Sequence, residues 1–414
     1  MSQTTRILFA LLAGIAIGIL GANLGWTTAA TIAEPIGNLW LDALRMTVVP
    51  LVVSLLITGI ARTADSARGG KLALHSVLLF VGLLWLVTAI AAFLVPALLK
   101  LWPMPQQAAA ALNAALGQTR PEVGAAPGLA DFLKSVVPTN PIAAAANDAM
   151  LPLILFATLF AIATTRLDSH ARDRITGLFS AIERAMLEIV NWVLWIAPLG
   201  VFALAFVVGM KAGTAAIGAL AHYIIIVSSA GFVAWALAYP LVVFGGGVRL
   251  RDFLRAVAPA QAVALSTQSS LASLPAMLRG CQQLGVPVEV AGVPLPIAVA
   301  IFRVTSPAMN LAVALYVAHW MGMDLSASAI AAGAVVAAIT TLGSISLPGQ
   351  VSFLTSVTPI ALAMGVPLAP LGLLVAVEMI PDLVRTVGNV TMDVAATTAL
   401  GRRQSNAKDR ELGL

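Results

Sequence analysis

Long apolar runs separated by short charged loops constrain the fold of this chain more than any other feature. The runs lie near residues 7–25, 46–61, 74–99, 149–165, 189–210 and 217–244. A helix of about 20 apolar residues crosses a bilayer, and in lipid every backbone polar group must be satisfied internally. Charged residues make up 10% of the chain, against about 25% in soluble proteins. The sequence therefore predicts an all-α polytopic membrane protein.

The distribution of Lys and Arg among the loops predicts the orientation. Loops 62–71, 166–184 and 245–255 and the tail are rich in Lys and Arg, whereas the loops around Glu34, Lys211 and Asp324 are poorer. Positively charged short loops stay in the cytoplasm, so we expect both termini on the cytoplasmic side of the cell inner membrane. The net charge of +5 thus bears on topology, and no nucleic-acid partner is expected.

Near the C-terminus, six polar residues share one face of a predicted helix. They are Glu378, Asp382, Arg385, Thr386, Asn389 and Asp393. At roughly 100° per residue they occupy an arc of about 100°. Ionisable residues inside a membrane segment indicate a functional site. The alternative is a structural ion pair of Asp382 with Arg385, which leaves Asn389 and Asp393 unexplained.

Two apolar segments in the second half are interrupted in the same way. Segment 256–279 is broken by the polar stretch 266–275, and segment 328–366 by 340–349, with Ser-Leu-Pro in both tips. Short apolar arms around a polar tip can re-enter a membrane. One span, near 295–320, separates them, so they would enter from opposite sides, as in an inverted repeat. We therefore predict eight transmembrane helices plus two re-entrant helical hairpins; two kinked transmembrane helices are the alternative.

Motifs spread over nearly the whole chain carry a family resemblance. They are Arg45-Met-x-x-Val-Pro50, Val137-Pro-Thr-Asn-Pro-Ile-Ala-Ala-Ala-Ala-Asn147, Ala197-Pro-Leu-Gly-Val-Phe-Ala203, Ser269-Ser-Leu-Ala-Ser-Leu-Pro275, Gly343-Ser-Ile-Ser-Leu-Pro-Gly349 and Asp382-x-x-Arg-Thr-x-x-Asn-Val-Thr-x-Asp393. Together they resemble the dicarboxylate/amino acid:cation symporters, the glutamate transporter family. The resemblance implies a homotrimer in which a transport domain moves substrate past a scaffold by an elevator motion, with the second hairpin as the outer gate.

The resemblance also implies a division of the chain. Residues 1–72 would hold scaffold helices 1 and 2, residues 73–101 helix 3 of the transport domain, and residues 102–245 the external loop and helices 4–6. Residues 246–400 would form the transport core of hairpin 1, helix 7, hairpin 2 and helix 8, and residues 401–414 a cytoplasmic tail.

Site residues follow from the same resemblance. The position of Asp382 binds the substrate's amino group, that of Arg385 its side-chain carboxylate, and those of Thr386 and Asn389 hydrogen-bond the substrate. The first-hairpin residues Ser269 and Ser270 would contact its main-chain carboxylate, and Gln268, Leu347 and Val351 complete the implied substrate site. The chemistry agrees, since a guanidinium fork matches a carboxylate and a buried aspartate needs a cation.

These residues predict a secondary active symporter that imports aspartate or glutamate with a cation. Its expected partners are a small-molecule substrate and membrane lipid, with no cofactor beyond the coupling ion, Na⁺ or H⁺. The alternatives are a C4-dicarboxylate or neutral amino acid symporter and, from another class, an anion channel or a non-transporting sensor. We call the six polar residues on the predicted C-terminal helix the polar stripe. An enzyme is not expected, because the polar stripe lacks a catalytic constellation.

The seventh helix departs from the family's sodium-binding motif, Asn-Met-Asp-Gly-Thr before Ala-Leu-Tyr. Aligning on Ala314-Leu-Tyr316 places Met309, Leu311 and Val313 at the Asn, Asp and Thr positions, and Pro307 at the Thr of a second sodium site. A shift of one residue would bring Asn310 near the Asn position but lose the Ala-Leu-Tyr match. Asn389 and Asp393 would remain as a partial sodium site.

Arg303 lies in the same apolar span, two turns before this stretch. We hypothesise that its guanidinium supplies the positive charge that sodium would place near Asp393. Transport would then be coupled to protons, with Glu378 or Asp393 titrating, or would be uncoupled. The alternative is that Arg303 snorkels or pairs locally.

Overall fold

The computed structural model describes residues 3–67, 70–105, 109–110, 113, 136–343 and 349–412, and every regular element in these ranges is a helix. The prediction of an all-α protein is confirmed. The first helices are α1 (Gln3–Asn23), α2 (Thr27–Arg45), α3 (Val48–Ala67), α4 (Lys71–Leu101), α7 (Pro141–Ala146), α8 (Met150–Thr164), α9 (Ser169–Trp195) and α10 (Ala197–Ala212). Most of residues 106–135, where the external loop expected within 102–245 would begin, lies outside the described residues.

The second half of the chain contributes the remaining helices. They are α11 (Ala215–Ala236), α12 (Ala238–Pro240), the π-helix η1 (Leu241–Gly245), α13 (Leu250–Thr267), α14 (Ser270–Gln283), α15 (Val288–Ala291), α16 (Pro294–Ile301), α17 (Thr305–Trp320), α18 (Ala327–Gly343), α19 (Gly349–Ala363), α20 (Ala369–Leu374) and α21 (Met379–Leu412).

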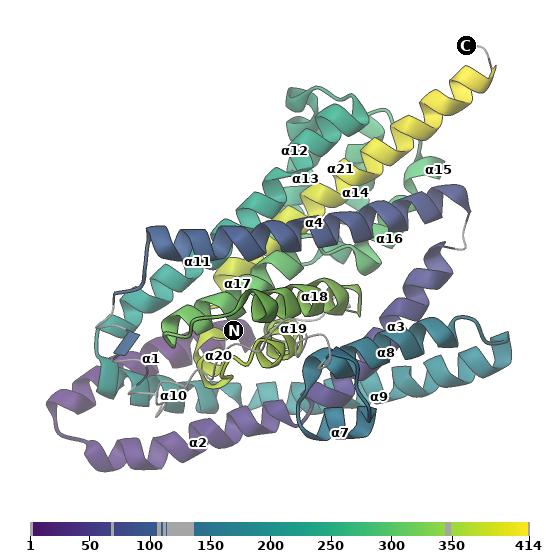
Figure 1. Cartoon of the computed structure of the whole chain (residues 1–414). Coiled ribbons are helices and arrows are strands. Elements are labelled where there is room, and N and C mark those ends of the chain that lie inside the picture. The colour runs from purple at the N-terminus through teal and green to yellow at the C-terminus, as the bar shows by residue number, and fades with distance from the viewer. Residues whose placement is uncertain are drawn as a thin grey trace.

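The helices pack in two groups (Figure 1). In the first, α1 packs along α10, α10 packs against α2, and α3 packs against α8 and α9. In the second, α21 packs against α11, α13 and α14, and α17 packs against α4, α11 and α18. The second group surrounds the apolar N-terminal half of α21, so the polar stripe lies in its interior.

Both interrupted segments form pairs of packed helices. In the first pair, α13 ends at Thr267, Gln268 adopts a left-handed conformation with φ of 51°, and the Ser269 hydroxyl caps α14. In the second pair, α18 packs against α19, and the tip between them, residues 344–348, lies outside the described residues. The helical arms are thus present, while their re-entry into a membrane stays a prediction.

Several charged segments predicted as loops are helical. Glu34 lies within α2, most of 166–184 belongs to α9, and α21 runs through the expected tail to Leu412. The prediction was wrong there because charged residues on a water-facing side leave the i→i−4 backbone bonds intact. Helices end instead at Gly, Pro and capping residues. Charge content therefore located the loops only approximately.

Within the described part of the chain, five helical stretches could cross a membrane by length and composition, or six if α9 and α10, bent by 54°, form one span. Shorter apolar helices include Met150–Thr164, that is α8. The apolar part of α21 carries Asp382, Arg385 and Asp393. These features explain why length and hydropathy do not recover all eight of the predicted spans.

Candidate functional site

The polar stripe of α21 is buried along its whole length. Glu378, Asp382, Arg385, Thr386, Asn389 and Asp393 are between 1% and 6% exposed. Glu378 lies in the turn before α21, and its carbonyl accepts the backbone N–H of Asp382 at 2.9 Å. Five of the six residues thus lie on one buried helix, as the sequence predicted, while Glu378 precedes this helix.

The guanidinium of Arg385 is the centre of a buried network. Its Nη2 donates to Oε1 of Glu378, its Nη1 donates to Oδ1 of Asn310 at 2.7 Å, and its Nε lies 3.3 Å from Oδ1 of Asp382. The hydroxyl of Tyr223 donates to the other Glu378 oxygen at 3.2 Å. The ion pair of Asp382 with Arg385 therefore exists, but within a network that joins α11, α17 and α21.

Asn389 is held by the start of α17. The backbone N–H of Thr305 and its hydroxyl approach Oδ1 of Asn389 at 3.0 and 2.8 Å, and the hydroxyl also lies 3.0 Å from the Arg385 carbonyl. Gly388 permits this approach, because a Cβ there would lie 2.6 Å from Cγ2 of Thr305. The Thr386 hydroxyl donates to the Asp382 carbonyl at 2.9 Å.

The first-hairpin residues form a second part of the predicted substrate site. Gln268 is exposed, and the Ser269 hydroxyl accepts the N–H of Ala272 at 3.2 Å. Among the described side chains, no hydrogen bond joins Gln268, Ser269 or Ser270 to the stripe. Leu347 lies outside the described residues, and Val351 is described only as part of the helix α19. Their roles in substrate binding stay predictions.

Sequence reasoning missed three partners of the stripe. Asn310 was considered only as a shifted sodium ligand, although a lone Asn in an apolar span is itself a signal. Thr305 and Tyr223 carried no comparable signal, because a hydroxyl is common in membrane helices and neither spacing nor motif connects these residues to α21. Only the packing of α11 and α17 against α21 brings them to the site.

The seventh span is broken, but not where the motif was placed. Helix α16 ends at Ile301 and α17 begins at Thr305, with Phe302, Arg303 and Val304 between them. Residues 309–313 lie instead within the buried, continuous helix α17. Irregular backbone inside a membrane protein is where carbonyl groups become available to a ligand. The backbone of the seventh span is therefore open at residues 302–304. The alignment of the sodium-binding motif with residues 309–313 did not locate this break.

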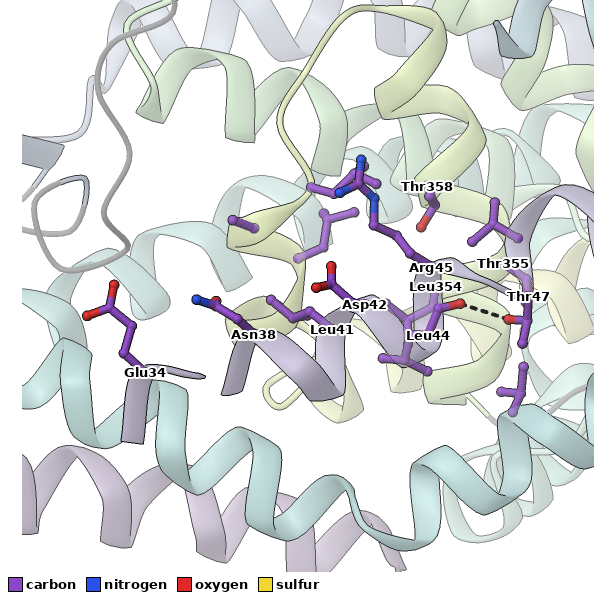
Figure 2. Close-up of a pocket in the computed structure, with 15 residues that line it drawn as sticks. Glu34, Asn38, Leu41, Asp42, Leu44, Arg45, Thr47, Leu354, Thr355 and Thr358 are labelled. Atoms are coloured by element: carbon purple, nitrogen blue, oxygen red, sulfur yellow. Dashed lines mark hydrogen bonds between the residues drawn. The ribbon is translucent and has the colours of Figure 1, made fainter. Parts of the chain in front are cut away.

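A separate cavity of about 380 Å³ lies between α2 and the α19–α20 region. Figure 2 shows Asp42 and Arg45 on α2 facing Thr358 across this space. Among the predicted substrate-binding residues whose side chains the structure describes, none lines it. The residues that line this cavity are not those of the buried network of Arg385.

A charged network enclosed by apolar helices, beside a broken span and paired helices, is the arrangement of a membrane transport protein. The chain belongs to the sodium:dicarboxylate symporter family, whose model matches residues 4–403.

Curated relatives cover nearly the whole chain. It is 27% identical over 435 residues to the proton/glutamate-aspartate symporter of Escherichia coli (strain K12), covering 99% of this chain and 96% of that protein. It is 27% identical over 409 residues to the proton/sodium-glutamate symport protein of Bacillus subtilis (strain 168), with coverage of 96% and 92%. The C4-dicarboxylate transport protein of Anaeromyxobacter sp. (strain K) is 27% identical over 405 residues, with coverage of 97% and 91%.

Proposed function

We propose that this protein is a secondary active symporter that imports an acidic amino acid, L-aspartate or L-glutamate, together with a cation. The observation that carries the proposal is the buried guanidinium of Arg385 beside the carboxylate of Asp382, with 3.3 Å between Nε and Oδ1. This pair offers one cationic and one anionic group side by side. An acidic amino acid presents the complementary pair, a side-chain carboxylate and an ammonium.

Arg385 keeps donors for such a ligand. A guanidinium has five N–H groups, and Arg385 donates two hydrogen bonds to described side chains, to Glu378 and Asn310. A substrate carboxylate would bind to the remaining donors, while its ammonium would bind to Asp382. Thr386 and Asn389 would orient the substrate from the same face of α21. Ser269, Ser270, Gln268, Leu347 and Val351 would close the site from the hairpins.

The charges of the core support cation coupling. The described carboxylates there are Glu378, Asp382 and Asp393, and the guanidinium groups are Arg385 and Arg303. With all five ionised, one negative charge remains uncompensated. An acidic amino acid adds another, and burying uncompensated charge in a low-dielectric interior is costly. Positive charge must therefore accompany the substrate.

For the coupling cation we propose the proton, with Glu378 as its carrier. The Glu378 carboxylate accepts from Tyr223 of α11 and from Arg385 of α21, and Asp382 lies near it in the first turn of α21. Protonation would remove its attraction for Arg385 and release that guanidinium for the substrate. Relatives named for proton symport and for proton/sodium symport are consistent with either ion.

We further propose the family's architecture for this chain: a homotrimer in the cell inner membrane, with eight spans, two re-entrant hairpins and both termini cytoplasmic. The scaffold and transport domains would follow the divisions given above. The packing supports an elevator motion, because the α18–α19 pair packs against α3 and α8 while the α13–α14 pair packs against α21. The two hairpins therefore have different surroundings, as alternating access requires.

A C4-dicarboxylate substrate is the second candidate, favoured by the relative named for that transport. Arg385 would bind one carboxylate of such a molecule as well as that of an amino acid. Asp382, however, would then face an anionic or apolar group in place of an ammonium. The position of Asp382 beside Arg385 therefore favours the amino acid.

Exchange of labelled for unlabelled L-aspartate in proteoliposomes tests the identity of the substrate. Vesicles loaded with unlabelled L-aspartate should take up labelled L-aspartate without any ion gradient. Excess external L-aspartate or L-glutamate should compete, while succinate and L-alanine should not. Competition by succinate alone would replace the proposal with the C4-dicarboxylate candidate, and competition by L-alanine alone would indicate a neutral amino acid carrier.

A further inference from the structure

The family's name implies sodium, and the described residues can be tested for a sodium site. Hard cations need about six oxygen ligands. Oδ1 of Asn389 is already bonded to Thr305, and the unpartnered atom of Asn389 is Nδ2, a donor. Oδ1 of Asp393 is buried without a hydrogen-bond partner. Of the expected pair, only Asp393 thus offers a side-chain oxygen not already engaged.

The side chains at the break between α16 and α17 do not supply the missing oxygen ligands. Its side chains, those of Phe302, Arg303 and Val304, contain no oxygen. The Phe302 ring stacks on Phe80 of α4, with centroids 4.4 Å apart and an interplanar angle of 13°. Both rings are buried. One side of the break is therefore sealed by an apolar pair, and the side chains of the break add no oxygen ligand to that of Asp393.

A cation is nevertheless present, because Arg303 belongs to the chain. Its guanidinium interacts electrostatically with Asp382 and Asp393 of α21. Its Nη1 donates to the hydroxyl of Ser352 on α19 at 3.4 Å. An arginine side chain stays protonated in proteins. Arg303 thus brings a fixed positive charge from the broken span to the carboxylates of one helix and to an arm of the second hairpin.

We propose that Arg303 is a tethered cation in the place of sodium. It compensates Asp393 and Asp382 and links α19 to α21, so the core closes without an inorganic ion. A tethered charge is not released in each transport cycle, and a sodium gradient therefore cannot be used. The consequence for transport rests on the proposed function, whereas the absence of sodium binding can be measured without any substrate.

Thermal unfolding of the purified full-length protein tests this with sodium as the only probe. The melting temperature of the wild type should be equal in sodium chloride and in choline chloride at the same ionic strength. Arg303→Ala leaves Asp393 uncompensated, leaves Asp382 with Arg385 as its cationic partner, and opens space beside both carboxylates. This variant should melt lower in choline and recover by about 2 °C or more in sodium.

Two further variants control the comparison. Arg255→Ala removes an arginine from the exposed side of α13. Its melting temperature should be the same in sodium chloride and in choline chloride. Arg303→Lys keeps the charge and should show no sodium response. If Arg303→Ala does not fold, Arg303→Gln gives the same comparison with a smaller loss of volume.

The inference requires both results: no sodium response in the wild type and a gained response when the charge is removed. Stabilisation of the wild type by sodium overturns it, and so does an uncharged variant that is insensitive to sodium. Neither outcome depends on which solute the protein carries. Failure here is therefore distinguishable from failure of L-aspartate exchange, which would overturn the proposed function instead.

Discussion

At the scale of single residues, Arg385 joins the groups that meet at the buried stripe. Its three nitrogen atoms face Glu378, Asn310 and Asp382 at once, which a compact ammonium cannot do. Arg385→Lys should weaken L-aspartate binding by about tenfold or more, or ~1.4 kcal/mol for each factor of ten. Isothermal titration of the purified protein measures this, with Arg255→Lys as the control. Wild-type affinity in Arg385→Lys would remove Arg385 from the binding site.

Glu378 should make substrate binding depend on pH. Ionised Glu378 competes with the substrate carboxylate for Arg385, so affinity for L-aspartate should rise as the pH falls from neutral toward the ordinary glutamate pKa of about 4.3. Glu378→Gln mimics the protonated form and keeps an oxygen that can accept from Tyr223 or Arg385. Its affinity should therefore change less over this range than that of the wild type. Equal pH dependence in the two proteins would assign the proton to another group.

The sequence identified the stripe but not its partners. Six polar residues at helical spacing in an apolar segment are conspicuous. All six are buried, five of them on α21 and Glu378 in the turn before it. Tyr223 and Thr305 could not be identified, because their relation to the stripe arises only from the packing of other helices. Arg303 was conspicuous as a charge in an apolar span, but its contact with Ser352 depends on the position of α19.

At the scale of elements, the junction of α17 with α21 depends on the absence of a side chain at Gly388. A Cβ there would lie 2.6 Å from Cγ2 of Thr305 and 3.1 Å from Cβ of Trp235. Gly388→Ala should therefore push α17 away, release Asn389 and cost about 1–3 kcal/mol of stability. Denaturation in detergent measures the loss.

Gly82→Ala is the matched control, since a Cβ at that position of α4 meets nothing within 4 Å. A helix-interior Gly→Ala change without a clash is neutral or stabilising. If Gly388→Ala were as stable as Gly82→Ala, the close junction of α17 and α21 would not hold Asn389 in place.

Element boundaries were predicted least well where charge was used to locate loops. Hydropathy identified α4 closely, but α2, α9 and the end of α21 continue through charged residues. The break at 302–304 was also missed, because Phe302 and Val304 are ordinary residues of an apolar helix. Hydropathy reports the environment of a side chain and says little about where the backbone opens.

At the scale of the whole molecule, the two groups of helices touch closely where α3 meets α18. A Cβ on Gly59 would clash with the backbone of Gly343 and lie 2.7 Å from the carbonyl of Leu342. Gly59→Ala should therefore destabilise this arrangement of the two groups. If transport requires one group to move past the other, the uptake rate should change while the affinity for L-aspartate in detergent stays unchanged.

Gly82→Ala again controls for the added methyl group and should match the wild type in both measurements. Altered affinity with a normal uptake rate in Gly59→Ala would show that this contact serves the binding site. That result would argue against relative motion at the α3–α18 contact.

The predictions about the whole molecule depended most on the resemblance to the family. Trimeric assembly and elevator motion concern surfaces and states that residue patterns in one chain do not define. The all-helical class followed from the apolar runs alone, because lipid leaves few ways to satisfy the backbone. The family likewise emerged from motifs that lie in both groups of helices.

The central claim is that the carrier accumulates an acidic amino acid with protons and without sodium. It is tested most directly by uptake of labelled L-aspartate into proteoliposomes, with an inward proton gradient and an inward sodium gradient imposed separately. We predict accumulation above the external concentration with the proton gradient, and equilibration only with the sodium gradient. Accumulation driven by sodium, or no accumulation with the proton gradient, would contradict the account.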